Sequence, residues 1–446
     1  MRPRGMGLGA GRWRWWGAAG AALFAGGLFV LARDVEGWNA IWYLPAWYGY
    51  LLVLDALIFR LQGSSPLSAR PREVAGWMLW SIPFWFLFEA YNLRLQNWYY
   101  VFALRSIVTA AVLSATAFAT VLPACFFHAE AVRALGIARG RRCRPIGVTP
   151  RVESVLLLLG VLSILAPLLW PRVAFPLVWG ATFCLPELLN RRAGAPSLLA
   201  DLEAGRCDRL MHLLAGGLWA GVAWESLNFF ARCKWIYTVP GFEDWKVFEM
   251  PLAGFLGFPV LALSAFNFSS LVSRLSSREA LRSPAGRARL AIAVALAAAL
   301  VVASYREMLS QTVRSRRPVL TELPGLDFGA ESRLRAHGIP TPERLERARR
   351  RHRLDDLSRR TGIPASLLER AGRHATLALH KGMGIPAARL LESVGIPTVA
   401  ELARARPEAL HARLRSAAGK ARMRPPRLAE VKVWVRAARL TGKPRR

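Results

Sequence analysis

The sequence has few of the residues that bind metals or form disulfides. Among its 446 residues there are 5 cysteines and 7 histidines. No cysteines form a C-x-x-C pair and no histidines have the H-E-x-x-H spacing, so we predict neither a disulfide framework nor a zinc site. The sequence likewise predicts no other cofactor. The cysteines are scattered along the chain, at Cys125, Cys143, Cys184, Cys207 and Cys233.

Acidic residues are also scarce. The chain has 29 Asp and Glu against 61 Lys and Arg, a net charge of +32, yet 53% of its residues are hydrophobic and 17 are Trp. A single soluble domain rarely combines these values, whereas a chain with segregated apolar and charged segments does. The segment 306–446 holds 32 basic and 13 acidic residues, or +19 of the net charge. We therefore predict an apolar membrane part followed by a basic, water-soluble tail.

Long apolar stretches dominate the first 305 residues. A bilayer core of about 30 Å requires about 20 mostly apolar helical residues, and nine stretches have or approach that length. The first begins just after Arg14, and no A-x-A-like site clearly follows it, so we expect a retained signal anchor. The expected spans are 15–32, 38–61, 74–93, 106–127, 152–170, 173–189, 209–231, 247–268 and 288–305.

The predicted fold class is all-α, with three parts. Residues 1–37 are an N-terminal basic segment and first span. Residues 38–305 form a polytopic transmembrane bundle with duplicated three-helix units, and residues 306–446 form a soluble helical domain.

Lys and Arg are distributed unevenly between the two ends of the spans. Basic loops stay in the cytoplasm, so we predict a multi-pass protein of the bacterial inner membrane with a cytoplasmic N-terminus. An odd number of spans places the tail outside; if 288–305 lies in the interface instead, the tail is cytoplasmic. The inner segments carry 22 basic residues against 7 in the opposite connections, and they are 1–14, 60–73, 128–151, 190–209 and 270–289.

Two blocks of the membrane part, about 38–127 and 173–268, have similar sequences. In each, an acid near the inner end of a span precedes a Gly-containing turn, and the next span carries Glu-x-x-Asn followed by Trp-x-Tyr. Such repeats usually mark duplicated helical units with a site at their junction. The corresponding residues are Asp55, Glu89, Asn92, Trp98 and Tyr100 in the first block, and Glu187, Glu225, Asn228, Trp235 and Tyr237 in the second.

Glutamate and asparagine three residues apart share one face of a helix. A carboxylate in hydrocarbon is costly unless it faces the bundle interior or a polar partner. We therefore expect Glu89, Glu225 and Glu249 to gather near the outer interface and to bind a ligand with their amide and aromatic neighbours. Two other interpretations stay open, because Trp and Tyr form interfacial belts and Glu–Asn pairs hold helices together. Asp55 and Glu187 lie near basic loops, where acids are more often ion-pair partners.

The motif W-E-x-x-N…W-x-Y…F-E-M-P-L-x-G-F-L-G-F, which begins at Trp224, resembles the lycopene cyclase domain of the small heterodimeric or fused bacterial type. The resemblance covers about residues 38–268 and implies a bundle of duplicated three-span units that binds an isoprenoid. An acid of that family is thought to protonate an alkene, which implies a catalytic role for Glu89, Glu225 or Glu249. The paired acids that the family carries after Pro-Leu are absent here, where the sequence reads F-E-M-P-L-A-G.

The tail carries short helical patterns separated by Gly-Ile-Pro. We expect each Gly to close a helix in a left-handed conformation, each Ile to be buried, and the Pro and the next residue to start a new helix. At Thr398 the T-x-x-E pattern with Glu401 predicts a capping box. The four copies start at Gly338, Gly362, Gly384 and Gly395.

These turns resemble helix-hairpin-helix repeats, and about residues 376–440 resemble an uncharacterised bacterial family of helix-hairpin-helix-like domains. The resemblance implies an anion site at the backbone amides of Gly382 and Gly384, with Lys381 and Arg389 beside it. The arginine-rich tail would add salt-dependent affinity for a polyanion. Many such hairpins bind proteins instead, so nucleic acid, another polyanion and a protein are all candidate partners.

Two functions from different classes follow. The first is a membrane protein that binds, or binds and modifies, an isoprenoid or other membrane lipid near the outer leaflet. The second is a non-enzymatic membrane anchor that presents its tail to a polyanion or a protein. A transporter or channel is a weaker third option, because no broken-helix or filter pattern supports it.

Overall fold

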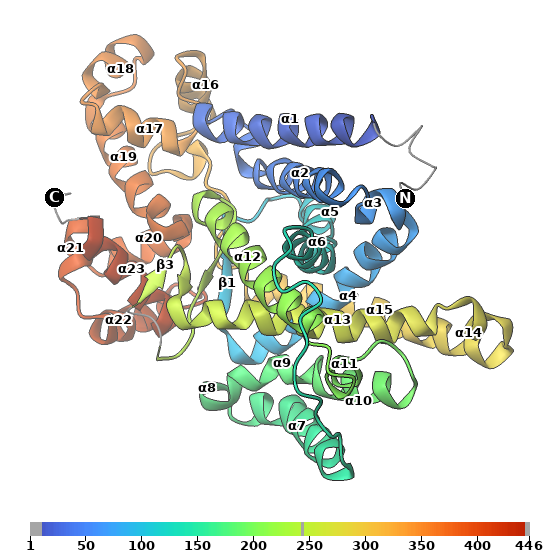
Figure 1. Ribbon diagram of the computed structural model, residues 1–446. Helices are drawn as coiled ribbons and strands as arrows, with labels where there is room; N and C mark the ends of the chain where they lie inside the picture. The colour runs from blue at the N-terminus through green and yellow to red at the C-terminus, as the bar shows by residue number, and fades with distance from the viewer. Residues whose placement is uncertain (1–10, 242–244, 442–446) are drawn as a thin grey trace.

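The chain folds into helices, as predicted, with two small two-stranded sheets (Figure 1). The computed structural model describes residues 11–241 and 245–441. Its membrane part contains α1 (Arg12–Arg33), α2 (Tyr43–Gln62), α3 (Pro66–Ala69), α4 (Pro71–Leu95), α5 (Ile107–Phe118), α6 (Val121–Ala134), α7 (Pro150–Leu169), α8 (Pro171–Ala174), α9 (Val178–Ala181), α10 (Cys184–Arg192), α11 (Leu198–Glu203), α12 (Asp208–Phe230), α13 (Gly257–Leu275), α14 (Arg278–Arg282) and α15 (Pro284–Gln311).

Smaller elements and the tail complete the chain. The tail helices are α16 (Phe328–Ala336), α17 (Pro342–Arg350), α18 (Leu354–Thr361), α19 (Ala365–Leu379), α20 (Gly384–Ser393), α21 (Val399–Arg404), α22 (Pro407–Lys420) and α23 (Leu428–Thr441). The strands are β1 (Trp98–Val101), β2 (Lys234–Tyr237), β3 (Lys246–Val247) and β4 (Met250–Pro251). The 3-10 helices are η1 (Trp38–Ala40), η2 (Phe175–Leu177), η3 (Leu252–Leu256), η4 (Leu320–Glu322) and η5 (His380–Gly382).

Seven segments of the described chain are long and apolar enough to cross a membrane. Together they fit a multi-pass membrane protein. The other two of the nine predicted spans fall on α4 and α12, which are long enough but carry more polar residues and lie inside the bundle. The seven are Trp13–Arg33, Tyr43–Gln62, Ile107–Ala134, Pro150–Leu169, Pro171–Arg192, Leu252–Arg282 and Pro284–Gln311.

Helix α12 packs closely on its neighbours because glycines line its contact faces. A Cβ at Gly216 would lie 2.4 Å from the Ala129 nitrogen in α6, and one at Gly217 would lie 2.6 Å from the Phe258 oxygen in α13. The outer helices are different, since α7 and α15 expose apolar side chains such as Leu158 and Val302. Such exposed apolar faces suit contact with lipid rather than water.

Asp55 in α2 and Glu187 in the first turn of α10 each bind the start of the next helix. Asp55 accepts hydrogen bonds from the Ser65 hydroxyl at 2.7 Å and the Leu67 amide at 3.1 Å. Glu187 accepts corresponding bonds from the hydroxyl of Ser197 and from the amide of Leu199, the latter at 2.8 Å. Both acids therefore satisfy free amide groups of a helix N-terminus, a role that differs from the ion pairing expected for them.

The two repeated blocks meet at a short sheet. Strand β1 follows α4 and β2 follows α12, and the strands pair antiparallel with Trp98 opposite Tyr237 and Tyr100 opposite Trp235. Side chains alternate between the faces of a strand. The intervening residues of this sheet, among them Tyr99, belong to the apolar core of the tail.

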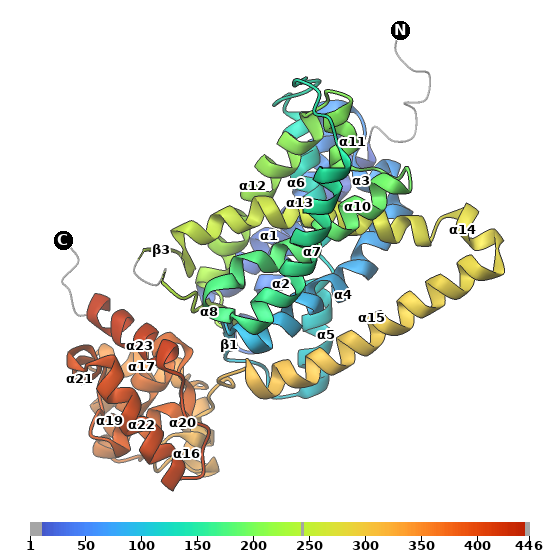
Figure 2. The ribbon, with the colours of Figure 1, turned by 90° about the horizontal axis from the view of Figure 1, so that it is seen from below.

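The tail packs against this sheet, at the far end of the bundle from α3, α11 and α14 (Figure 2). Helix α15 continues to Gln311, six residues beyond the predicted tail boundary at 305/306. The chain then follows β1, with the Tyr100 amide donating to the Thr312 oxygen at 2.9 Å and the Arg314 amide donating to the Tyr100 oxygen at 2.8 Å. The tail therefore lies at the opposite end from the basic connections that carry α3, α11 and α14.

The Gly-Ile-Pro turns follow the expected geometry in three of the four copies. Gly338, Gly362 and Gly395 have φ values of +78°, +67° and +75°, and each lies between two helices. Gly384 also has a positive φ, but it is the first residue of α20 instead of the last of a helix. The capping box at Thr398 is confirmed.

Candidate functional site

Glu89 lies in the last turns of α4 and is completely buried. Its Oε1 atom accepts hydrogen bonds from Trp85 Nε1 at 3.0 Å, Trp98 Nε1 at 3.1 Å and the Tyr100 hydroxyl at 2.5 Å. Trp85 precedes Glu89 by one helical turn on the same face. The carboxylate therefore holds the aromatic side chains of β1 against α4.

Glu225 occupies the corresponding place on α12 and is also completely buried. Its Oε1 atom accepts from Trp235 Nε1 at 3.2 Å and from the Tyr237 hydroxyl at 3.0 Å. Burial and the neighbouring Glu225 raise the pKa of the Tyr237 hydroxyl well above its ordinary value. The phenol consequently stays protonated and remains a hydrogen-bond donor.

The two asparagines orient the strand backbone. Asn92 accepts from the Trp98 amide at 3.2 Å and donates to the Trp98 oxygen at 3.0 Å. Asn228 makes the same pair of contacts with Trp235, at 3.2 Å and 3.1 Å. Both side-chain amides thus bind the backbone of a strand tryptophan and position it. Neither asparagine lines the cavity that these tryptophans surround.

The aromatic side chains of both blocks enclose one cavity of about 100 Å³, which we call the aromatic cavity. Among the predicted site residues, Glu225 and the four strand aromatics line it. Sequence reasoning missed several others, because they come from elements that pack here only in the folded bundle. The lining residues are Tyr43, Trp85, Trp98, Tyr100, Ala117, Phe118, Val121, Trp179, Trp224, Glu225, Trp235, Tyr237, Met250, Gly254, Gly257, Phe258 and Leu261.

Each of the two buried carboxyls has one oxygen without a partner. Within residues 11–241 and 245–441, no hydrogen bond reaches the Oε2 atom of Glu89 or of Glu225. A buried polar atom normally has a partner, and Glu225 is the acid that lines the cavity. This carboxyl can therefore accept a hydrogen bond from a ligand or, when protonated, donate one to it.

Glu249, the third predicted acid, has a different environment. Lys234 Nζ lies 2.6 Å from its Oε1 atom, and Lys381 Nζ lies 2.9 Å from the same oxygen. Burial acts to raise the pKa of Glu249, but the two ammonium groups outweigh it and hold the pKa below its ordinary value. Glu249 is therefore an ionised ion-pair residue at the tail interface, and it does not line the aromatic cavity.

Two residues of the predicted anion site, Lys381 and Gly382, contact the membrane part, and the other two contact the tail itself. Lys381 contacts Glu249, and a Cβ at Gly382 would lie 2.4 Å from the Val101 side chain. A Cβ at Gly384 would lie 2.7 Å from the Cβ of Ser315. Arg389 donates to the backbone oxygen of Glu322 at 2.8 Å.

A cavity of about 360 Å³ remains at this junction. Cationic and acidic side chains both line it, namely Arg232, Lys234, Arg347, Lys381, Glu343 and Glu346. Because the lining carries charges of both signs, it does not favour an anionic ligand over a cationic one.

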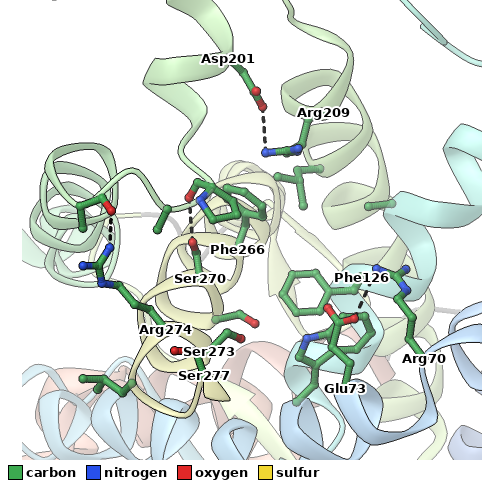
Figure 3. Close-up of a pocket in the computed structure, with 18 of the residues that line it drawn as sticks. Arg70, Glu73, Phe126, Asp201, Arg209, Phe266, Ser270, Ser273, Arg274 and Ser277 are labelled. Carbon is green, nitrogen blue, oxygen red and sulfur yellow. Dashed lines mark hydrogen bonds and ion pairs between the residues drawn. The ribbon is translucent and has the colours of Figure 1, made fainter. Parts of the chain in front are cut away.

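A larger cavity, of about 1060 Å³, lies at the end of the bundle with the basic connections (Figure 3). Its charged groups largely pair with one another, for example Arg209 with Asp201 at 2.9 Å and Arg70 with Glu130 at 3.2 Å. Arg274 donates to the Ala193 oxygen. Sequence reasoning did not predict this cavity, and the internal pairing leaves less charge for a ligand than its arginines suggest.

Fold and site together define an all-α protein with an apolar multi-pass bundle, an aromatic cavity between its two repeated blocks and a helical tail docked on the connecting sheet. Residues 325–441 match the model of a domain of unknown function, DUF4332. The match covers α16 to α23. It is longer than the helix-hairpin-helix-like resemblance, which covers about residues 376–440. No curated protein and no solved structure matches the chain.

Proposed function

We propose that the membrane part binds an apolar, isoprenoid-like chain or another membrane lipid in the aromatic cavity. The observation that carries the proposal is the buried Glu225 carboxyl, which lines this cavity and has one oxygen without a hydrogen-bond partner among the described residues. Aromatic walls favour unsaturated or cationic groups through their π faces. Because the cavity is small, we infer that it takes one end of the ligand while the remainder lies between helices or in lipid.

The catalytic form of this proposal assigns general-acid chemistry to Glu225. Its proton would pass to a carbon–carbon double bond, the aromatic faces would stabilise the carbocation, and loss of a proton from a neighbouring carbon would complete an isomerisation or ring closure. The lycopene-cyclase-like motifs of residues 38–268 support this form. Of Glu89, Glu225 and Glu249, we assign this role to Glu225. Glu89 binds the polar groups of Trp98 and Tyr100 and does not line the cavity, and Glu249 pairs with two lysines.

Expression in a lycopene-accumulating host tests the catalytic form. Cyclisation should change the pigment, and Glu225→Gln should abolish that change while Glu89→Gln, its counterpart outside the cavity lining, should retain part of it. Unchanged pigment with the protein present in the membrane would reject carotenoid cyclisation.

Binding is tested separately, by mass spectrometry of the lipids that copurify with the protein in detergent. An apolar lipid retained by the wild-type chain and reduced in Glu225→Gln would support the site. Equal retention by both proteins would place the ligand elsewhere.

A specific observation also supports the alternative, a membrane anchor with a polyanion-binding tail. Helices α17 and α18 and the turn between them expose five arginines, three of which also pair with an acid of their own helix. Purified full-length protein in lipid nanodiscs, titrated with duplex DNA at two salt concentrations, should bind with a steep salt dependence if this surface contacts phosphates. No binding at low salt would reject nucleic acid as the partner. The exposed residues are Arg350, Arg351, Arg353, Arg359 and Arg360.

We also propose an inner-membrane location, with the N-terminus cytoplasmic and the tail outside. The charge bias of the connections supports it, as does the position of the tail at the opposite end of the bundle. A reporter fused after Arg446 should be active in the periplasm and inactive in the cytoplasm; the reverse result would place the tail inside.

A further inference from the structure

The fold brings together two cysteines that are far apart in the sequence. Cys143 lies in the connection between α6 and α7, and Cys207 is the residue before α12. The Cys143 amide donates to the Gly205 oxygen at 3.0 Å and the Cys207 amide donates to the Arg141 oxygen at 3.3 Å, around an antiparallel bridge between Arg142 and Arg206.

This pairing places the two thiols on the same side of the bridge. Cys143 and Cys207 lie on opposite segments, one residue to either side of the bridged pair, and residues two apart in a strand point to the same face. Diagonal neighbours across an antiparallel pair have Cα atoms roughly 7–8 Å apart, so a small movement of the two connecting segments brings the thiols to disulfide distance. Burial raises the pKa of the Cys143 thiol, and so does the neighbouring Cys207 thiol. The Cys207 thiol donates to the Arg141 oxygen at 3.4 Å, on the segment that carries Cys143.

The surroundings of the two thiols are cationic and accessible. Arg141, Arg142 and Arg144 flank Cys143, Arg206 precedes Cys207, and all four arginines are exposed. Both cysteines are themselves partly exposed, whereas Cys125 and Cys184 are buried. Positive charge at this surface attracts an anionic oxidant.

We propose that Cys143 and Cys207 form a reversible intramolecular disulfide in response to a small anionic disulfide such as oxidised glutathione. The bond would tie the α6–α7 connection to the start of α12. These connections are predicted to face the cytoplasm, where thiols are normally reduced, so the bond would form when the thiol pool is oxidised.

The chemistry is two successive thiol–disulfide exchanges. One cysteine thiolate attacks the external disulfide R–S–S–R, forming a protein–S–S–R bond and releasing R–S⁻. The second cysteine thiolate then attacks the protein sulfur of that bond and releases the second R–S⁻. The protein loses two electrons and two protons, and the external disulfide is reduced to two R–SH.

The test uses the full-length protein, purified in detergent under reducing conditions and then treated with oxidised glutathione. After alkylation of free thiols in denaturant, mass spectrometry should find a peptide pair linked by Cys143 and Cys207. The link should be lost in Cys143→Ser and in Cys207→Ser. In each variant the remaining cysteine should retain one glutathione, because no second thiol displaces it.

Two controls decide whether the link is intramolecular and selective. Cys233→Ser should form it as the wild type does, and a mixture of isotopically light and heavy protein should yield no mixed pairs. Wild-type protein carrying separate glutathiones on Cys143 and Cys207, or links between light and heavy chains, would overturn the proposal.

Discussion

The Lys381 ammonium group in the tail lies 2.9 Å and 3.1 Å from the two carboxylate oxygens of Glu249 in the membrane part. Glu249 directly precedes Met250, a residue of β4 that lines the aromatic cavity. One ion pair therefore connects the docked tail to a wall of the candidate site. Lys234, on β2 of the other sheet, is the second cation at this carboxylate.

We expect Lys381→Met to loosen the tail. Glu249 is almost completely buried, so removing one of its two cations leaves a poorly compensated charge. Retention of Lys234 limits the loss to about 1–3 kcal/mol of docking free energy. Limited proteolysis between α15 and the tail should be faster in Lys381→Met than in the exposed control Lys420→Met; equal rates would show that the ion pair does not hold the tail.

The same contact predicts a pH dependence. The pKa of Glu249 lies below its ordinary value of 4.5 in the folded chain, so the folded state binds a proton less readily than the unfolded state. The stabilisation is therefore present above about pH 4.5 and is lost as the pH falls through the lower folded pKa. Proteolysis of the tail linker by an acid-active protease should accelerate below pH 4.5 in the wild type. The acceleration should be smaller in Glu249→Gln, and an identical response in both would contradict this origin.

The two buried glutamates should respond differently to loss of their tyrosine donor. Among the described residues, Tyr237→Phe leaves Trp235 as the side-chain donor at hydrogen-bond distance from Glu225, whereas Tyr100→Phe leaves Glu89 with Trp85 and Trp98. A lost bond to a buried carboxyl costs about 1–3 kcal/mol, and more when fewer donors remain. The apparent melting temperature in detergent should fall further for Tyr237→Phe, and the opposite order would contradict the assigned hydrogen bonds.

Gly217→Ala tests the close contact of α12 with α13. Its new methyl group would lie 2.6 Å from the Phe258 oxygen and 2.8 Å from the Ala262 side chain, so the helices must separate. Overpacking of this kind costs about 1–3 kcal/mol. The matched change Gly26→Ala in α1 adds a methyl group with no neighbour within 4 Å, and its melting temperature should stay at or above that of the wild type. Equal stability of both variants would argue against tight α12–α13 packing.

The sequence by itself determined the helical class, the apolar segments and the turns of the tail. These depend on local properties: the length of an apolar helix against the bilayer thickness, the positive φ that Gly338, Gly362 and Gly395 adopt, and the cap at Thr398. The repeated Glu-x-x-Asn pattern also identified Glu89 and Glu225 as candidate site residues, because residues three apart in a helix lie on the same face.

Only the tertiary structure decided which of those residues share a space. Trp179 and Trp224 join the aromatic cavity, Lys381 binds Glu249, and the segment of Cys143 pairs with the segment of Cys207. None of these contacts has a sequence signature, because each joins residues that are distant along the chain and are brought together by helix packing. Burial and pairing then determine whether a carboxyl such as Glu249 or Glu225 acts as an ion-pair partner or faces a cavity.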